Sequence, residues 1–218
     1  MRINIQDRFH LNNIPLFLFI AIFIGFFIVT FAEAKPRDKE RWDNNFNEEF
    51  YIYGKKPVPF LVDNVNILPK GKALDLAMGE GRNGVYLATK GFDVLGLDIS
   101  PVGLDKAQML AEENGVTIST AIADLEEVDL EKDTYDVILC MYYLQRDLFS
   151  KMKDALKSGG MVVVETYNTD YLKYSNFNKK YLLEPNELLE IFKDFKIIKY
   201  EMFDDGEEAY SSIIAQKP

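Results

Sequence analysis

Cysteine and histidine are almost absent from this sequence of 218 residues, and each absence excludes a class of functional site. The single cysteine, Cys140, excludes an intrachain disulfide framework and a cysteine-rich metal site. The single histidine, His10, lies near the N-terminus, so the rest of the chain has no histidine for a metal cluster or a Ser–His dyad. Because no histidine adjoins it, Cys140 is expected to be a small buried hydrophobic residue rather than a nucleophile. We therefore expect no metal site.

Runs of basic residues are also scarce. The formal net charge is −10, and lysine and arginine never occupy more than a few consecutive positions. Nucleic-acid backbones are bound by clustered lysine and arginine, so we expect no nucleic-acid partner. The 48% of hydrophobic residues supplies material for a core, and the length fits one domain with an appendage.

The longest uncharged run covers residues 14–32, and four basic residues follow it within residues 35–41. A helix of this length, at about 1.5 Å per residue, reaches close to the ~30 Å hydrocarbon core of a bilayer. The positive-inside rule then places the C-terminal side in the cytoplasm. The alternative is an export signal cleaved near Ala34, although the run exceeds the usual ~7–15 apolar residues. We expect an anchor or signal at 1–34, a charged linker at 35–41 and a folded domain at 42–218.

A strand, a glycine turn and a helix are predicted between residues 72 and 88. The apolar run at 73–77 has the length of a buried parallel strand, and Gly79, Gly81 and Gly84 then form G-x-G-x-x-G. Such a turn points backbone N–H groups at a polar ligand, which the missing Cβ atoms let approach closely. The glycines alone also fit a βα turn in an unrelated α/β protein.

Acidic residues narrow the choice of ligand. Asp98 ends another apolar run about 20 residues later, where an acid binds ribose hydroxyls in nucleotide-binding folds. Asp75 lies inside the strand that precedes the glycines. A carboxylate at that place would repel a nicotinamide pyrophosphate and suits a ligand that carries a positive charge.

The stretch from Asp75 to Gly81, DLAMGEG, resembles motif I of the class I S-adenosylmethionine-dependent methyltransferases, with Ala77 in place of the most common glycine. The resemblance implies that the turn passes close to the methionine part of the cofactor and that Asp75 helps to place its amino group. It also implies that Asp98 binds the ribose and that Asp124 contacts the adenine amino group. The cofactor-binding residues expected in the motifs are Asp75, Ala77, Gly79, Gly81, Asn83, Asp98, Ile99, Ala123, Asp124 and Leu125.

Aromatic residues are concentrated between Trp42 and Pro69, ahead of the first strand. One interpretation is a helix and loop that cap an edge of the sheet, and the other is a lid over the cofactor. The segment resembles a leader of the small TehB-like (tellurite resistance) and thiopurine-methyltransferase-like proteins, in which this region closes over the cofactor. That resemblance adds Trp42 and Tyr53 to the cofactor-binding candidates.

Strands that alternate with helices, followed by a hairpin at 197–215, predict a doubly wound α/β sheet with helices on both faces. The resemblance extends over residues 42–217 and implies the Rossmann-like seven-stranded sheet of class I methyltransferases, with the last strand antiparallel. The boundaries expected from the sequence include a third strand at 116–123 and a fifth at 161–166.

The acceptor side is expected after the fourth strand, 135–141, because ligands of open α/β sheets bind beyond the carboxyl ends of the strands. Tyr143 and Arg146 are candidates to contact the acceptor; otherwise Tyr143 is a packing residue and Arg146 begins the next helix. The predicted function is methyl transfer from S-adenosylmethionine to a small molecule. A soft nucleophile such as a thiol or a selenium or tellurium oxyanion needs little proton removal, although Tyr, Asp or Glu could act as a base. The alternatives are an NAD(P)-dependent oxidoreductase and a non-catalytic nucleotide-binding protein tethered to the membrane.

Overall fold

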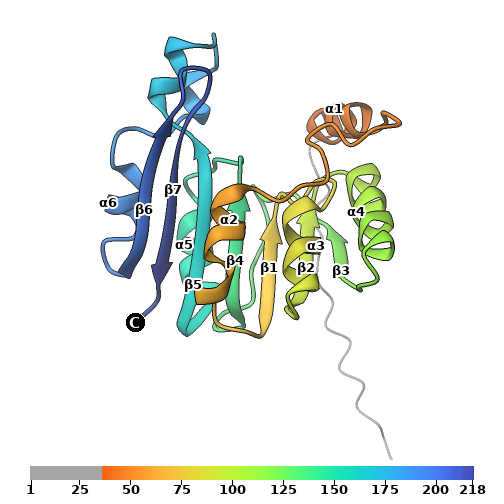
Figure 1. Ribbon diagram of the computed structural model, residues 1–218, viewed down its shortest axis with the longest axis horizontal. Coiled ribbons are helices and arrows are strands. Elements are labelled where there is room, and N and C mark those ends of the chain that lie inside the picture. The colour runs from red at the N-terminus through yellow and green to blue at the C-terminus, as the bar shows by residue number, and fades with distance from the viewer. Residues whose placement is uncertain (1–35) are drawn as a thin grey trace, which may run out of the picture. The chain divides into compact units, whose positions relative to one another are not determined.

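The computed structural model describes residues 36–218 (Figure 1). The predicted anchor or signal at 1–34 lies outside the described residues, as does His10. In the described part, no helix combines the length and the apolar character that a membrane span requires.

Seven strands form one sheet in the order β3-β2-β1-β4-β5-β7-β6. β7 is antiparallel to its neighbours β5 and β6, and the other neighbouring strands are parallel. The strands are β1 Lys72–Leu76, β2 Asp93–Asp98, β3 Ser119–Ile122, β4 Tyr135–Met141, β5 Leu156–Tyr167, β6 Lys196–Asp204 and β7 Ala209–Gln216. The doubly wound sheet with an antiparallel last strand, predicted from the sequence, is confirmed.

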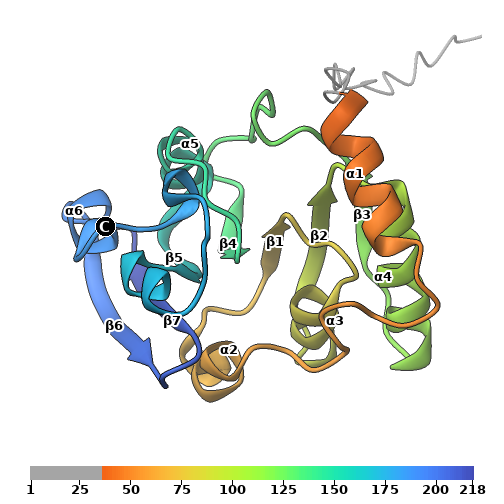
Figure 2. The same ribbon diagram turned by 90° about the horizontal axis from the view of Figure 1, so that it is seen from above.

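Helices cover both faces of this sheet, as the view from above shows (Figure 2). They are α1 Pro36–Phe46, α2 Pro59–Asn64, α3 Arg82–Thr89, α4 Pro101–Glu113, α5 Leu148–Ala155 and α6 Glu187–Ile191, with 3-10 turns at Val65–Ile67, Thr169–Lys173 and Lys179–Tyr181. Alternate strand residues point to opposite faces, so Ile138 packs in the core beneath α5 and Leu139 packs beneath α2 and α3. Both faces are apolar because both are covered, which explains why the central strands read as continuous hydrophobic runs.

Three boundaries differ from those expected. The segment expected as a charged linker is helical from Pro36 onward, and ion pairs Lys39–Asp43 (i,i+4) and Arg41–Asp38 (i,i+3) support that helix. β3 has only four residues because the backbone N–H of Val116 instead bonds the Ala111 carbonyl at the end of α4.

The fifth strand is longer than the expected 161–166. α5 ends at Ala155, and β5 begins at once with Leu156, which pairs with Tyr135 of β4. Glycines at 159 and 160 lie inside the strand rather than ending the helix. The register of β4 against β5 shifts beside them, between Tyr135 and Val137.

Candidate functional site

The turn after β1 is built from three residues in left-handed backbone conformations. Their φ angles are 57° at Ala77, 54° at Gly79 and 86° at Gly81, the residue that precedes α3. A Cβ added at Gly81 would lie 2.6 Å from the Cβ of Ala107 in α4, so α4 packs directly on the turn. The glycines allow this conformation and this close approach. Ala77 adopts the same conformation with a side chain, which costs about 1 kcal/mol or more.

Asp98, the last residue of β2, is fixed to this turn. Its Oδ2 accepts a hydrogen bond from the Gly79 N–H at 2.7 Å, and its Oδ1 accepts one from the Ser100 N–H at 2.9 Å. Burial raises the pKa of this carboxyl, and the backbone N–H groups oppose the rise. The two bonds set the orientation of the carboxylate, and each oxygen keeps a lone pair for a ligand hydroxyl.

Asp75 lies in β1 directly beneath the turn and is 2% exposed. Burial raises its pKa to about 7, although the Gly84 N–H lowers it. Its Oδ2 has no hydrogen-bond partner within residues 36–218. A buried carboxylate oxygen without a partner is unfavourable unless a cationic or hydrogen-bonding ligand group reaches it.

Asp124 follows β3, and the Ala123 N–H bonds the Asp98 carbonyl at 2.9 Å, which keeps the ends of β2 and β3 together. Asp124 is buried, and its Oδ1 accepts a hydrogen bond from the Glu126 N–H at 2.9 Å. The structure therefore brings the three predicted acids to one edge of three adjacent strands, β3-β2-β1. Ile99 and Leu125 follow their acids at the same edge.

Helix α1 lies on the side of the sheet where the parallel strands end, over α4 and β3 and beside β2 (Figures 1 and 2). Its Phe46 ring is close enough to Gly79 that an added Cβ there would lie 3.1 Å away. Trp42 stacks on Phe46 at 5.3 Å between ring centroids, and Asp43 accepts a 2.6 Å hydrogen bond from the Ser100 hydroxyl. α1 therefore packs beside the glycine turn, and its role as a lid over the cofactor stays a prediction. The capping interpretation applies to α2, whose Phe60 and Leu61 pack on a face of the sheet.

The loop after α1 is tied down by Lys106 of α4. The Lys106 ammonium lies within hydrogen-bonding distance of the carbonyls of Phe46, Glu48 and Phe50. It also pairs with the buried Glu80 of the glycine turn at 2.5 Å. Neither Glu80 nor Lys106 was predicted from the sequence, because their partners lie far along the chain.

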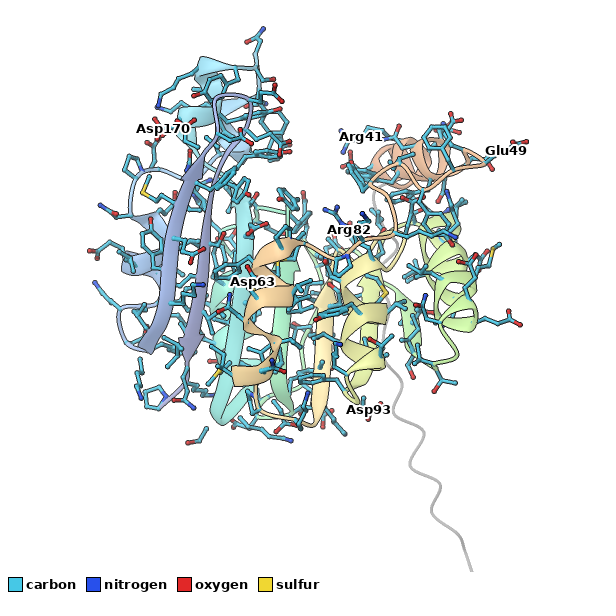
Figure 3. All side chains as sticks on the ribbon, viewed as in Figure 1. Arg41, Glu49, Asp63, Arg82, Asp93 and Asp170 are labelled. Carbon is cyan, nitrogen blue, oxygen red and sulfur yellow. The ribbon has the colours of Figure 1, made fainter. Side chains whose placement is uncertain are left out.

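Asn83 and Tyr53, two predicted cofactor residues, hold the leader to the turn. The Asn83 Oδ1 accepts a hydrogen bond from the Val58 N–H at 3.0 Å. The Tyr53 carbonyl accepts one from Arg82 Nη1 at 3.0 Å, and the Tyr53 ring is exposed. In Figure 3, Arg82 lies below Arg41 of α1, at the opposite edge of the sheet from Asp93.

Tyr143 and Arg146, the two residues predicted to contact the acceptor, form hydrogen bonds within the protein. The Tyr143 hydroxyl donates to Gln145 Oε1 at 2.7 Å. Arg146 makes four hydrogen bonds, two to the Glu187 carboxylate and one each to the carbonyls of residues 180 and 182. Arg146 therefore holds the segment before α6 in place. An anionic acceptor that binds Arg146 would have to displace the Glu187 carboxylate.

Three residues that were not predicted as site residues lie closer to the glycine turn on this side. Glu165 lies buried near the carboxyl end of β5, Tyr142 follows β4, and the Arg82 guanidinium lies 5.6 Å from the centroid of the Tyr142 ring. The order of the carboxyl ends of the strands could have identified Tyr142 and Glu165. Arg82 was not predicted because it lies within the glycine motif, which was interpreted through its glycines alone.

Comparisons with known proteins identify the family and the fold. The family model described as tellurite resistance protein TehB matches residues 42–208. A Haemophilus influenzae protein named "Probable S-adenosyl-L-methionine-dependent methyltransferase TehB" is 28% identical over 148 residues, 64% of this chain and 51% of that protein. A ubiquinone biosynthesis O-methyltransferase of Aliivibrio fischeri is 33% identical over 124 residues, 53% of this chain and 52% of that protein. The chain thus spans about half the length of the curated relatives it matches.

Solved structures share the fold. The crystal structure of TehB from Haemophilus influenzae superposes with a TM-score of 0.64 at 22% identity, over 83% of this chain and 67% of that one. A geranyl diphosphate C-methyltransferase from Streptomyces coelicolor, solved with S-adenosylhomocysteine, superposes with a TM-score of 0.64 at 17% identity, over 86% of this chain and 100% of that one. The fold is that of the class I methyltransferases, and the chain belongs to the TehB family.

Proposed function

We propose that the protein transfers a methyl group from S-adenosylmethionine to a small-molecule acceptor. The observation that carries this proposal is the set of three buried acids at the carboxyl edge of β3-β2-β1, beside a left-handed glycine turn. Asp75 offers an unpaired buried oxygen to the ligand's ammonium group, Asp98 a positioned carboxylate to the ribose, and Asp124 a carboxylate to the adenine amino group.

The chemistry suits a site without histidine. The bound sulfonium is a strong electrophile, so the protein has mainly to hold the nucleophile in line with the methyl group. Residues after β4 and β5 are in position for that, because β4 adjoins β1 in the sheet. Phe46 of α1 packs against Gly79 of the turn, and Trp42 stacks on Phe46, so these rings would limit the access of water to a ligand on that side.

The comparisons do not support an NAD(P)-dependent oxidoreductase. The negative charge of Asp75 is a separate argument against one. A dinucleotide would bring a pyrophosphate to the turn, where the buried Asp75 already raises the electrostatic cost of a negative charge. A tethered protein that binds the nucleotide without catalysis would leave Tyr142 and Glu165 without a chemical role.

The acceptor itself is open to two proposals. The family's description, tellurite resistance, favours the soft nucleophile expected from the sequence, a thiol or a selenium or tellurium oxyanion. The name of the Aliivibrio fischeri relative favours an oxygen nucleophile instead. Both fit a small molecule bound beyond β4, and they differ in whether a proton must be removed.

Calorimetric titration of the full chain tests the cofactor. We expect S-adenosylmethionine and S-adenosylhomocysteine to bind and NADH not to bind. Asp98→Ala should weaken both adenosyl ligands by about tenfold to a hundredfold, because it removes hydrogen bonds made by an ionised group. Asp63→Ala, an exposed acid on α2, is the matched control and should leave both affinities unchanged. Binding of NADH alone would overturn the proposal.

We also propose that residues 14–32 hold the domain at a membrane, with the domain on the cytoplasmic side, where S-adenosylmethionine is available. The length of the uncharged run and the basic residues that follow it support this location. Carbonate extraction of the full chain should leave it in the membrane fraction, and a chain begun at Lys35 should be released. A mature N-terminus near Ala34, found by mass spectrometry, would instead support export after cleavage.

A further inference from the structure

A carboxylate that is not among the predicted cofactor-binding residues, Glu165, is buried near the carboxyl end of β5. Glu165 is 1% exposed, its Oε1 accepts a 2.9 Å hydrogen bond from the Tyr142 hydroxyl, and its Oε2 accepts a 2.6 Å hydrogen bond from the Ser212 hydroxyl. An apolar side chain would fill the space of Glu165 without the free-energy cost of removing a carboxylate from water. The acid therefore requires an explanation beyond packing.

Tyr142 connects this acid to the glycine turn. Leu76 of β1 pairs with Cys140 of β4, so the residues that follow these two strands, including Tyr142 and the turn, leave the sheet side by side. Tyr142 has a φ of 56°, a left-handed conformation that a bulky residue rarely adopts. The Arg82 guanidinium lies 5.6 Å from the centroid of the Tyr142 ring. The hydroxyl donates its proton to Glu165, so its lone pairs remain to accept one from a ligand.

The surroundings of Tyr142 are aromatic. Tyr167 tilts against the Tyr142 ring at 5.3 Å between centroids, and Tyr210 meets it edge-on at 6.3 Å. Arg82 is the cation on the glycine side of the ring, and it forms no ion pair with a carboxylate among residues 36–218. Tyr167 and Tyr210 already stack on Tyr171 and Phe203. The Tyr142 ring and the guanidinium plane of Arg82 favour a planar ligand through stacking. An oxyanion bound by charge would instead need several converging cations.

We propose that Tyr142 and Glu165 form a proton relay at an acceptor subsite, and that the acceptor is a hydroxyl group carried on a planar ring, a phenol or an enol. This deepens the proposed function and rests on it. The acceptor oxygen forms a bond to the methyl carbon as the bond from carbon to sulfur breaks. The acceptor's proton passes to the Tyr142 oxygen, the Tyr142 proton passes to Glu165, and neutral S-adenosylhomocysteine leaves.

The electrostatics of Glu165 are consistent with a proton acceptor. Burial raises its pKa, which makes the carboxylate more basic. The hydrogen bonds from Ser212 and Tyr142 and the charge of Arg82 oppose the rise, whereas the charge of Glu201 on β6 adds to it. Tyr142 acts on the acceptor directly, and Glu165 acts through Tyr142 as a positioning and relay residue.

Phenol and thiophenol are matched probes because each consists of the same ring with one acidic group. At pH 8 the hydroxyl of phenol keeps its proton, whereas the thiol of thiophenol is mostly ionised, so only phenol needs a proton acceptor. The full chain is first titrated with S-adenosylhomocysteine, then with each probe. Methyl transfer from S-adenosylmethionine is then followed for phenol, thiophenol and sodium tellurite. We expect Glu165→Gln and Tyr142→Phe to slow transfer to phenol by about a hundredfold or more, the usual contribution of a positioned acid or base. Transfer to thiophenol should change less than about threefold.

Two further variants separate a relay from a structural role. Ser212→Ala removes one hydrogen bond to the Glu165 carboxylate and leaves Tyr142 in place, so the pKa of Glu165 should rise. The acid limb of the pH profile for phenol should then move to higher pH, and it should disappear in Glu165→Gln. Tyr171→Phe alters a neighbouring ring that stacks on Tyr167 and should change neither rate.

The outcomes are distinguishable. If S-adenosylhomocysteine fails to bind, the proposed function fails. If it binds and phenol does not bind that complex, or if tellurite or thiophenol is methylated and phenol is not, the relay is overturned while the methyltransferase stands. Equal losses for phenol and thiophenol in Glu165→Gln, with unchanged affinity for S-adenosylhomocysteine, would also overturn it.

Discussion

At the scale of a single residue, Asp75 destabilises the free protein but provides a carboxylate for a cationic ligand group. The carboxylate is buried in β1 with one oxygen unpaired, and burial raises its pKa to about 7. An acid whose pKa is higher in the folded state than in the unfolded state destabilises the fold as the pH rises between the two values. The free protein therefore carries a strained charge that a cationic ligand group would neutralise.

Asp75→Asn should stabilise the free protein in a pH-dependent way. Well below pH 4 Asp75 is protonated in both the folded and the unfolded state, and the two proteins should unfold alike. Between pH 4 and 7 the wild type should lose stability relative to the variant, by up to about 4 kcal/mol, and the difference should stay constant above pH 7. Urea denaturation at a series of pH values measures it. Asp93→Asn, an exposed acid at the start of β2, is the control, and a gain independent of pH would contradict the assignment.

Ala77 supplies a second test at one residue. Its φ of 57° places a Cβ in the left-handed region, at a strain of about 1 kcal/mol or more. Ala77→Gly removes this strain but adds about 0.4–1 kcal/mol of unfolded-state entropy, so the free energy of unfolding should rise slightly, by under about 1 kcal/mol. Ala88→Gly in α3 is the matched change in ordinary helical backbone and should lower stability by about 0.5–1 kcal/mol. Losses of equal size in both variants would show that Ala77 is not strained.

At the scale of elements, the position of α1 depends on α4. Phe46 and Asp43 contact the glycine turn and Ser100, but the loop after α1 is held through the ammonium of Lys106. The same lysine neutralises the buried Glu80. One side chain thus couples the loop after α1 to the glycine turn.

Lys106→Met combined with Glu80→Gln removes this coupling without leaving a buried charge alone. We expect proteolysis within residues 47–55 to accelerate and the affinity for S-adenosylhomocysteine to fall by about tenfold, the equivalent of one or two net hydrogen bonds. Lys55→Met breaks an exposed ion pair with Glu113 in the same region and should change neither quantity. A double variant with unchanged affinity would show that α1 does not act as a lid.

These elements also show what the sequence could and could not predict. The central strands and the glycine turn were predictable because their signals are local: apolar runs of strand length, and glycines next to them. The length of β3 was not, since the N–H of Val116 bonds the end of α4 instead of the sheet. The start of α1 was missed although its ion pairs are local, because the charged run was interpreted as a linker. Arg146 was assigned to the acceptor because its partner Glu187 lies 41 residues away, beyond any local signal. Glu165 is visible as the end of a strand, but its burial is not.

At the scale of the whole domain, the sheet separates two tasks. β3-β2-β1 carries the three acids on one side, and β4, β5 and β7 carry Tyr142, Glu165 and Ser212 on the other. The two halves meet where β1 pairs with β4, at which point the strand order reverses. This is the place where ligands of doubly wound sheets bind, since the loops diverge there. A cofactor bound across β1 would present its methyl group to the residues that follow β4.

Because the sheet is continuous, a ligand bound to one half should stabilise the whole domain against unfolding. At a concentration 100 times its dissociation constant, S-adenosylhomocysteine should add about 2.7 kcal/mol, a rise of about 5–10 °C in the midpoint for a domain of this size. At equal concentration, 5′-methylthioadenosine should give a smaller rise, because it lacks the amino acid part that would reach Asp75. In Asp75→Asn the two ligands should raise the midpoint by more similar amounts. Asp63→Asn should preserve the difference between the two rises that the wild type shows. If Asp75→Asn leaves that difference intact, the ammonium group does not bind at Asp75, and the orientation proposed for the cofactor must be reversed.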